Sequence, residues 1–122
     1  MAMDSEITLV IPAKDRPEQT KNLFESLIRA GIKCRIIVID DCSETPIASL
    51  AGEYTGLNLS LVRNNKCIGP AASRNIGIKQ SRTRFVAFTD NDVSVNSSWL
   101  PLLYRHIVGM MASFVKTRFN QI

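Results

Sequence analysis

Short apolar runs alternate along the chain with stretches in which apolar residues recur at helical spacing. Four runs rich in β-branched and aromatic residues predict strands at 7–11, 35–39, 57–63 and 84–89, and a fifth at 111–118. The run at 35–39 is apolar at nearly every position, which is typical of a strand buried on both faces. Pro12 follows the first run, and because proline cannot donate to a sheet ladder, we expect it at a strand end or edge.

Helical patterns fill the spaces between these runs. Pro17 fits the first turn of a helix that carries apolar residues at helical spacing and ends at Gly31. Weaker helical character follows near 46–54, Pro70 begins a helix of small residues ending near Lys79, and Ser97 or Ser98 can cap a last long helix. Strands alternating with helices predict right-handed crossovers, and therefore an α/β fold with a mainly parallel sheet and helices on both faces.

Length and composition predict one soluble domain spanning residues 1–122. Apolar residues make up 45% of the chain and charged residues 21%, which is typical of a packed globular core. The net charge of +4 comes from 15 basic and 11 acidic residues, and the basic ones are dispersed. Dispersed cations give no continuous track for phosphates, so we expect no nucleic-acid partner.

The cysteines and the amino terminus bear on the compartment. Cys34, Cys42 and Cys67 match no zinc-ligand spacing, and their odd number argues against a disulfide framework. We therefore expect three free thiols in a reducing cytosol. The acidic amino terminus does not resemble a signal peptide, and no apolar run approaches the roughly 20 residues of a membrane helix. A cytoplasmic protein without a membrane span is the prediction.

Acidic pairs follow two of the predicted strands, where ligands bind in parallel sheets. Asp90 and Asp92 offer the oxygen donors that Mg²⁺ or Mn²⁺ prefers, although Asp and Asn are also common in turns. Asp40-Asp41 could accept hydrogen bonds from a base or ribose, or could simply belong to a loop that caps a helix.

The segment 69–77 adds a candidate anion site. Its glycine and small residues permit close approach to a helix start, where free amides and the helix dipole favour anions. Arg74 lies about one turn into this helix and has a planar fork of donors suited to phosphate. An ordinary helix with a surface arginine is the alternative.

Four linked motifs together resemble family 2 glycosyltransferases. They are Ile-Pro-Ala-Lys-Asp-Arg, Val-Ile-Asp-Asp-Cys-Ser, Gly-Pro-Ala-Ala-Ser-Arg-Asn-Ile-Gly and Phe-Val-Ala-Phe-Thr-Asp-Asn-Asp, in this order within residues 7–99. The resemblance implies a Rossmann-like GT-A fold and binding of a UDP- or GDP-sugar with Mn²⁺ or Mg²⁺. Two departures are Cys42, where the family usually has glycine, and Ile68, which replaces the first glycine of the usual Gly-Gly-Pro.

The resemblance also implies a role for individual residues. The nucleoside base would lie against Pro12, Ala13, Lys14, Asp15 and Asp41. Arg74 would lie by the base or the diphosphate, Asp90 by the ribose, and Asp92 would bind the metal.

No catalytic residue can be assigned, because the chain contains no Asp or Glu after Asp92, whereas family members use an acidic base well beyond that position. His106, the only histidine, is expected at the surface. We therefore expect the nucleotide-sugar-binding portion of an inverting glycosyltransferase acting on an unknown acceptor, with the acceptor-binding portion missing. The alternative is a truncated, non-catalytic module that binds a nucleotide sugar or forms a homo-oligomer through the apolar segment 107–115.

Overall fold

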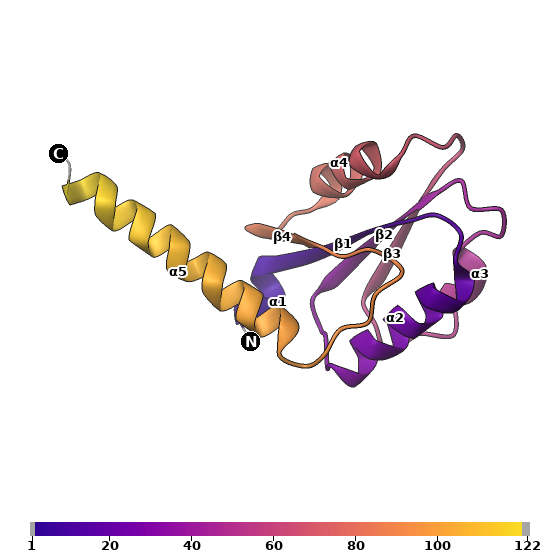
Figure 1. The fold of residues 1–122 in the computed structure, drawn as a ribbon, viewed down its shortest axis with the longest axis horizontal. Helices are drawn as coiled ribbons and strands as arrows, with labels where there is room; N and C mark the ends of the chain where they lie inside the picture. Colours follow the sequence, from indigo (N-terminus) through magenta and orange to yellow (C-terminus); the bar gives the residue numbers. More distant parts are fainter. Residues whose placement is uncertain (1, 121–122) are drawn as a thin grey trace.

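Four parallel strands form a single sheet in the order β3-β2-β1-β4 (Figure 1). The computed structural model describes residues 2–120, and the side chains of residues 2–112. The elements are α1 (Ala2–Glu6), β1 (Ile7–Ala13), α2 (Pro17–Arg29), β2 (Arg35–Asp41), α3 (Ala48–Ala51), β3 (Leu59–Asn64), α4 (Pro70–Gln80), β4 (Phe85–Phe88) and α5 (Trp99–Asn120). Helix α4 covers one face of the sheet, and α2 and α3 lie on the other, so the predicted α/β fold is confirmed.

The core forms around the two central strands, which are apolar on both faces. Leu23, Phe24 and Leu27 of α2 are fully buried against one face. On the opposite face Ile37 packs in a smaller cluster with Val10, which α4 covers. These strands hold the loops at their carboxyl ends in fixed positions.

Pro12 lies in a central strand, so its predicted place at a strand end or edge is only partly right. Thr89 donates its backbone N–H to the Val10 carbonyl at 3.3 Å, which shows that Val10 faces β4. Successive residues of a strand direct their backbone N–H and C=O groups to alternate sides, so the backbone of Pro12 faces β4, as that of Val10 does. The pairing between β1 and β4, however, already ends at Val10. The missing N–H of Pro12 therefore interrupts no ladder bond.

The predicted fifth strand is wrong, because the backbone of 111–118 belongs to helix α5. Gly109 is the one break signal before this run, and a single glycine weakens a helix by only about 1 kcal/mol. Leu100 anchors the first turn of α5 in the core, and Leu103 and Tyr104 pack against the same cluster, while the later turns project away from the sheet (Figure 1). Within residues 2–120, no helix is long and apolar enough to cross a membrane.

Candidate functional site

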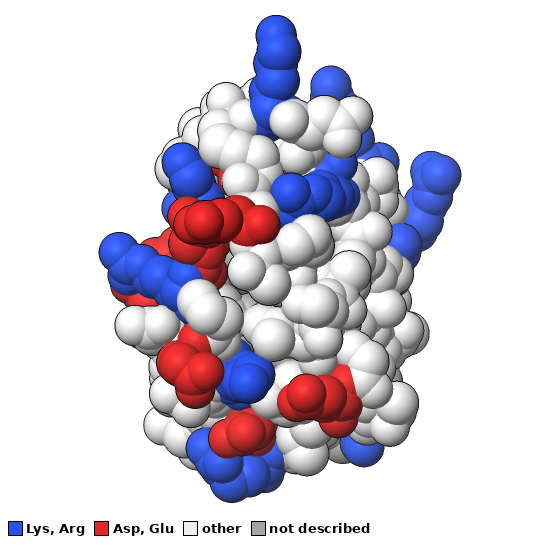
Figure 2. Space-filling view, turned by 90° about the vertical axis from the view of Figure 1, so that its right-hand side faces the viewer, with Lys and Arg blue, Asp and Glu red and all other residues white. Residues whose placement is uncertain are grey.

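A cleft of about 440 Å³ lies at the carboxyl ends of the strands, where segments distant in sequence meet. It is lined by Pro12, Ala13, Lys14, Arg16, Asp41, Cys67, Gly69, Pro70, Ser73, Asp90, Asn91 and Asp92. Figure 2 views this side of the molecule and shows acidic and basic side chains interspersed. The cleft therefore offers paired charges of both signs and no broad field of one sign.

Asp41 is the most firmly held carboxylate of the cleft and is only 4% exposed. Its Oδ1 accepts hydrogen bonds from the Ile68 N–H (2.8 Å) and the Asn64 side chain (3.1 Å), and its Oδ2 accepts one from the Gly69 N–H (2.9 Å). Burial opposes ionisation of Asp41, but these hydrogen bonds and the charge of Lys14 outweigh it and lower the pKa. Asp41 thereby fixes the backbone that leads into α4.

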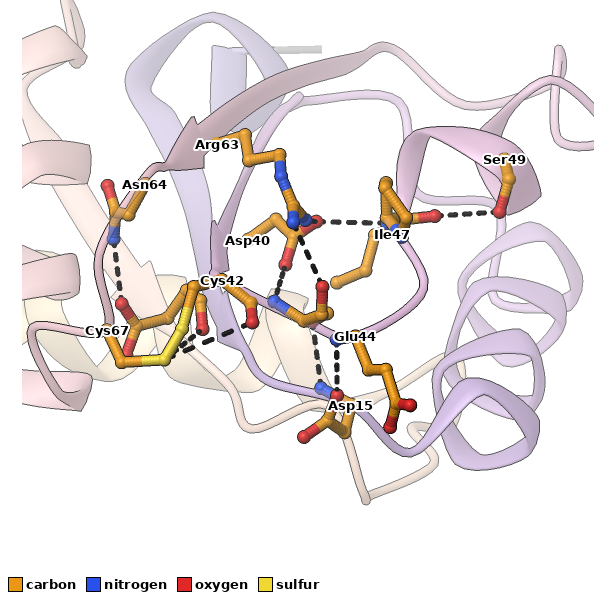
Figure 3. A network of polar contacts seen from close by, with 12 residues as sticks. Asp15, Asp40, Cys42, Glu44, Ile47, Ser49, Arg63, Asn64 and Cys67 are labelled. Atoms are coloured by element: carbon orange, nitrogen blue, oxygen red, sulfur yellow. Dashed lines mark hydrogen bonds and ion pairs between the residues drawn. A yellow bond between two sulfur atoms is a disulfide. The ribbon is translucent and has the colours of Figure 1, made fainter.

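The adjacent Asp40 points the other way, because successive side chains of a strand lie on opposite faces. It accepts hydrogen bonds from the backbone N–H groups of Ser43 and Ile47, both at 3.0 Å, and from Arg63 at 2.8 Å (Figure 3). Burial opposes ionisation of Asp40 too, yet these partners lower its pKa. Of the two consecutive acids, Asp40 shapes the 43–47 loop and Asp41 lines the cleft.

Asp15 was predicted to contact the nucleotide, but it does not line the cleft. Its backbone N–H donates to Ser43 Oγ, and its Oδ1 accepts from the Glu44 N–H, both at 2.8 Å (Figure 3). It joins the loops after β1 and β2. The next residue, Arg16, lines the cleft instead and forms an ion pair of 2.6 Å with Asp92.

In the turn 90–92 the central residue is buried and anchors the turn, while the two residues beside it are accessible. Asn91 is 8% exposed and donates to the Asp15 carbonyl (3.1 Å) and to Thr20 Oγ1 (3.0 Å), which anchors the turn on the start of α2. Asp90 and Asp92 keep their carboxylates accessible beside the cleft. Arg74 does not line the cleft itself but reaches Asp90 at 3.5 Å.

The donor set fits a divalent cation that brings further ligands of its own. Asp90 and Asp92 are accessible oxygen donors of the type that Mg²⁺ and Mn²⁺ prefer. Among the side chains that the structure describes, no three His, Cys, Asp or Glu residues gather closely enough to hold a metal. The protein would supply one or two carboxylates, as is usual for cations that also bind phosphate oxygens and water.

Helix α4 presents its amino terminus to the cleft through Gly69, Pro70 and Ser73. Gly69 has a φ of 90°, which favours glycine, and no side chain caps the helix. Amides in a first helical turn lack acceptors within the helix, and the helix dipole adds partial positive charge. This end of α4 is therefore suited to an anion.

The expectation of three free thiols is wrong, because a disulfide joins Cys42 to Cys67 (Figure 3). Their Cα atoms lie 5.2 Å apart although they are separated by 25 positions in the sequence. Cys34 alone is free, and burial raises the pKa of its thiol to about 11. Counting cysteines could not reveal the pair, since only the parallel packing of β2 beside β3 brings the two loops together.

Two residues that line or support the cleft, Arg16 and Asn64, were absent from the sequence-based site. Arg16 directly follows the segment assigned to the base, and its place next to a helix-starting proline was the available signal. Asn64 donates to both Asp41 and Ser73, at 3.1 and 3.3 Å. No sequence pattern marks that bridge.

Comparison with known proteins agrees with this geometry. The family described as "Glycosyl transferase family 2" matches residues 8–120. A pre-mycofactocin glycosyltransferase of Mycobacterium tuberculosis is 33% identical over 115 residues, which cover 93% of this chain and 23% of that protein. The succinoglycan biosynthesis protein ExoO of Rhizobium meliloti is 29% identical over 74% of this chain and 26% of its own length. The chain thus spans about a quarter of these two relatives.

Solved structures share the fold. TarS of S. aureus superposes with a TM-score of 0.74 at 24% identity, over 85% of this chain and 32% of that one. The mannosyltransferase PcManGT of Pyrobaculum calidifontis, solved with GDP-Man and Mn²⁺, gives a TM-score of 0.66 at 18% identity, over 73% of this chain and 28% of that one. The sheet and its helices therefore have the GT-A arrangement, as the sequence motifs implied.

Proposed function

Because this chain belongs to glycosyl transferase family 2, we propose that its cleft binds a nucleoside-diphosphate sugar together with a divalent cation, for transfer of the sugar to an acceptor. The observation that carries this proposal is the meeting of four separate segments in one cleft: 12–16, Asp41, 67–73 and 90–92. An acidic turn alone would be commonplace. An acidic turn facing a helix amino terminus across a cleft of about 440 Å³ suits an anionic ligand bridged by a cation.

The two ends of the cleft suit different parts of the donor. Pro12, Ala13 and Lys14 form an apolar wall with one cation next to the buried Asp41, which we assign to the nucleoside base and ribose. Asp41 already accepts three hydrogen bonds from the protein, so we assign it mainly to shaping this wall. Asp15 acts through the loop it holds.

The diphosphate is assigned to the start of α4 and the nearby arginines. The N–H groups of Ala71 and Ala72, which lack acceptors within the first turn of α4, and the helix dipole favour an anion beside Gly69 and Pro70. Arg74, paired with Asp90, can turn its fork of donors toward the base or the phosphates, and Asp90 toward a ribose hydroxyl.

The metal is assigned to Asp92, with Asp90 beside it. A divalent cation, when bound, would neutralise charge on the departing diphosphate. That PcManGT was solved with Mn²⁺ and GDP-Man supports a cation in this fold, although it does not select Mn²⁺ over Mg²⁺ here.

Acceptor binding and proton removal are assigned to protein outside these residues. The sequence contains no Asp or Glu after Asp92 to act as a base, and the chain spans about a quarter of the curated relatives cited above. Inverting transfer, in which a base deprotonates the acceptor hydroxyl, is the reaction we propose for the whole enzyme.

A cytoplasmic location stays a prediction, and the Cys42–Cys67 disulfide argues against a strongly reducing compartment.

Titration calorimetry and thermal unfolding test the proposal directly. UDP, GDP and their sugars are added with and without Mn²⁺ to the wild-type chain and to Asp92→Ala. One nucleoside diphosphate should stabilise the chain, Mn²⁺ should strengthen the effect, and Asp92→Ala should abolish the strengthening. Indifference of the wild-type chain to every nucleotide in the presence of Mn²⁺ would refute donor binding by this chain.

A second candidate, self-association, is favoured by helix α5. Its exposed apolar side chains include Leu102 (58% exposed), Met110 (60%) and Met111 (42%), on a helix that projects from the sheet (Figure 1). Such side chains suit a second copy of the helix more than water. Light scattering across a concentration series tests this, and a strict monomer at high concentration would eliminate it.

A further inference from the structure

The turn before α2 holds two successive non-glycine residues in the left-handed backbone region. Asp15 has a φ of 57° and Arg16 a φ of 55°. Residues with a Cβ disfavour this region, and such backbone persists only where its surroundings fix it. The energetic cost of this left-handed backbone indicates that the position of Arg16 serves a function.

Hydrogen bonds from three segments of the chain fix this turn. Asp15 is held by Ser43 and Glu44 of the loop after β2, each at 2.8 Å, and its carbonyl accepts from Asn91 at 3.1 Å. The Arg16 carbonyl accepts from Thr20 Oγ1 at 2.9 Å. The backbone of Arg16 is thus fixed independently of its guanidinium.

The guanidinium of Arg16 lies on the carboxylate that the proposed function gives to the metal. Arg16 Nη1 and Asp92 Oδ2 are 2.6 Å apart, both residues line the cleft, and their side chains are 57% and 38% exposed. Two cations on one carboxylate repel each other, so a divalent cation at Asp92 would weaken its ion pair with Arg16. The exposure of Arg16 leaves its side chain room to turn elsewhere within the cleft.

We propose that Arg16 is a positioning residue that pairs with Asp92 in the free protein and transfers to the donor diphosphate when a divalent cation takes Asp92. This inference rests on the proposed function. Phosphate oxygens suit the planar fork of a guanidinium at least as well as a carboxylate does. The anchored turn keeps Arg16 within reach of the cleft both when it pairs with Asp92 and when it binds the diphosphate.

The exchange couples the two ligands. The cation releases Arg16 from Asp92 and so makes it available to the diphosphate, while the diphosphate draws Arg16 away and exposes Asp92 to the cation. Coupling between two ligands is reciprocal, so each should raise the affinity for the other by the same factor. Direct contact between the cation and the phosphates supplies one part of this coupling factor. The part that Arg16 supplies should disappear when Arg16 is replaced.

The test compares wild type with Arg16→Gln, using Mn²⁺ alone, UDP or GDP alone, and both together. Free Mn²⁺ is followed by its electron paramagnetic resonance signal and the nucleotides by calorimetry. Arg16→Gln should bind Mn²⁺ alone about two- to five-fold more tightly, the range expected for an exposed ion pair. It should bind the metal-free nucleotide several-fold more weakly and show a smaller coupling factor.

Two further variants separate this exchange from structural damage. Arg29→Gln changes an exposed arginine in the last turn of α2, away from the cleft, and should behave as wild type. Asp92→Asn should strengthen metal-free nucleotide binding, because it frees Arg16 while leaving the turn intact. A general loss of structure would weaken that binding instead.

The outcomes distinguish the inference from the proposed function. No nucleotide binding by the wild-type chain with Mn²⁺ present would refute the proposed function itself. Nucleotide binding that is unchanged in Arg16→Gln, or weakened in Asp92→Asn, would refute the exchange while leaving donor binding intact. Unchanged or weaker Mn²⁺ affinity in Arg16→Gln would refute it as well.

Discussion

The disulfide between Cys42 and Cys67 should supply a large part of the stability of this domain. A cross-link between residues separated by 25 positions restricts the unfolded chain, and the loop-entropy relation gives a stabilisation of about 3.5 kcal/mol at 25 °C. Whole domains are stabilised by only about 5–15 kcal/mol. For a chain of 122 residues, 1 kcal/mol corresponds to roughly 4 °C, so reduction should lower the Tm by on the order of 10 °C.

Denaturation with and without a phosphine reductant measures this loss, and thiol alkylation with mass spectrometry identifies the pair. After unfolding without reductant, one thiol should be alkylated, and after reduction three. In the folded protein Cys34 should resist alkylation, since burial raises the pKa of its thiol to about 11. The control is the double variant Cys42→Ser/Cys67→Ser, whose Tm should not respond to reductant.

Two results would refute this reasoning. Three alkylated thiols in unreduced, unfolded protein would mean that the cysteines are not bonded. A reductant effect of the same size in wild type and the double variant would mean that the stability change has another origin.

Other changes probe the core, the acidic loops and the anchored turn. Gly77→Ala should destabilise the fold by about 1–3 kcal/mol, because its new Cβ would overlap the buried Val10 side chain. The double variant Gly77→Ala/Val10→Ala should lose less stability than the sum of the two single variants. Strictly additive losses in urea titrations would contradict this. Asp40 and Asp41 have lowered pKa values in the folded protein, so their stabilisation is complete above the unfolded value of about 4 and is lost as the pH falls through the folded values. A urea midpoint that stays constant from pH 6 down to pH 2 would argue against this. Asn91→Ala should cost about 1–3 kcal/mol by removing the two hydrogen bonds that anchor the turn 90–92, and an unchanged unfolding curve would show that the amide contributes nothing.

Local sequence patterns were sufficient for most of the secondary structure. The four β-rich runs became strands β1 to β4, and the helices after Pro17 and Pro70 begin at those residues. Periodicity and proline placement act over a few residues, so the sequence displays them directly. The same local signals misassigned 111–118, because a short apolar run suits a strand or a helix, and here the helix that begins at Trp99 continues through it.

The general position of the site also followed from the sequence. Parallel strands end at one edge of their sheet, so Asp41 and the turn 90–92 were expected to converge, and they line the same cleft. The resemblance of the four motifs to family 2 glycosyltransferases is what implied a nucleotide sugar as the ligand.

Only the tertiary structure decided which neighbouring side chains enter the cleft. Asp41 enters it and Asp40 does not; Arg16 enters it and Asp15 holds a loop; Asn91 is buried between two accessible acids. Whether a side chain enters the cleft depends on the alternation of side chains along β2 for Asp40 and Asp41, and on the left-handed backbone of the turn for Arg16. The hydrogen bonds that hold these segments include partners 28 or more positions away in the sequence. The Cys42–Cys67 disulfide has the same origin, since the sequence records its two cysteines but not the 5.2 Å between their Cα atoms.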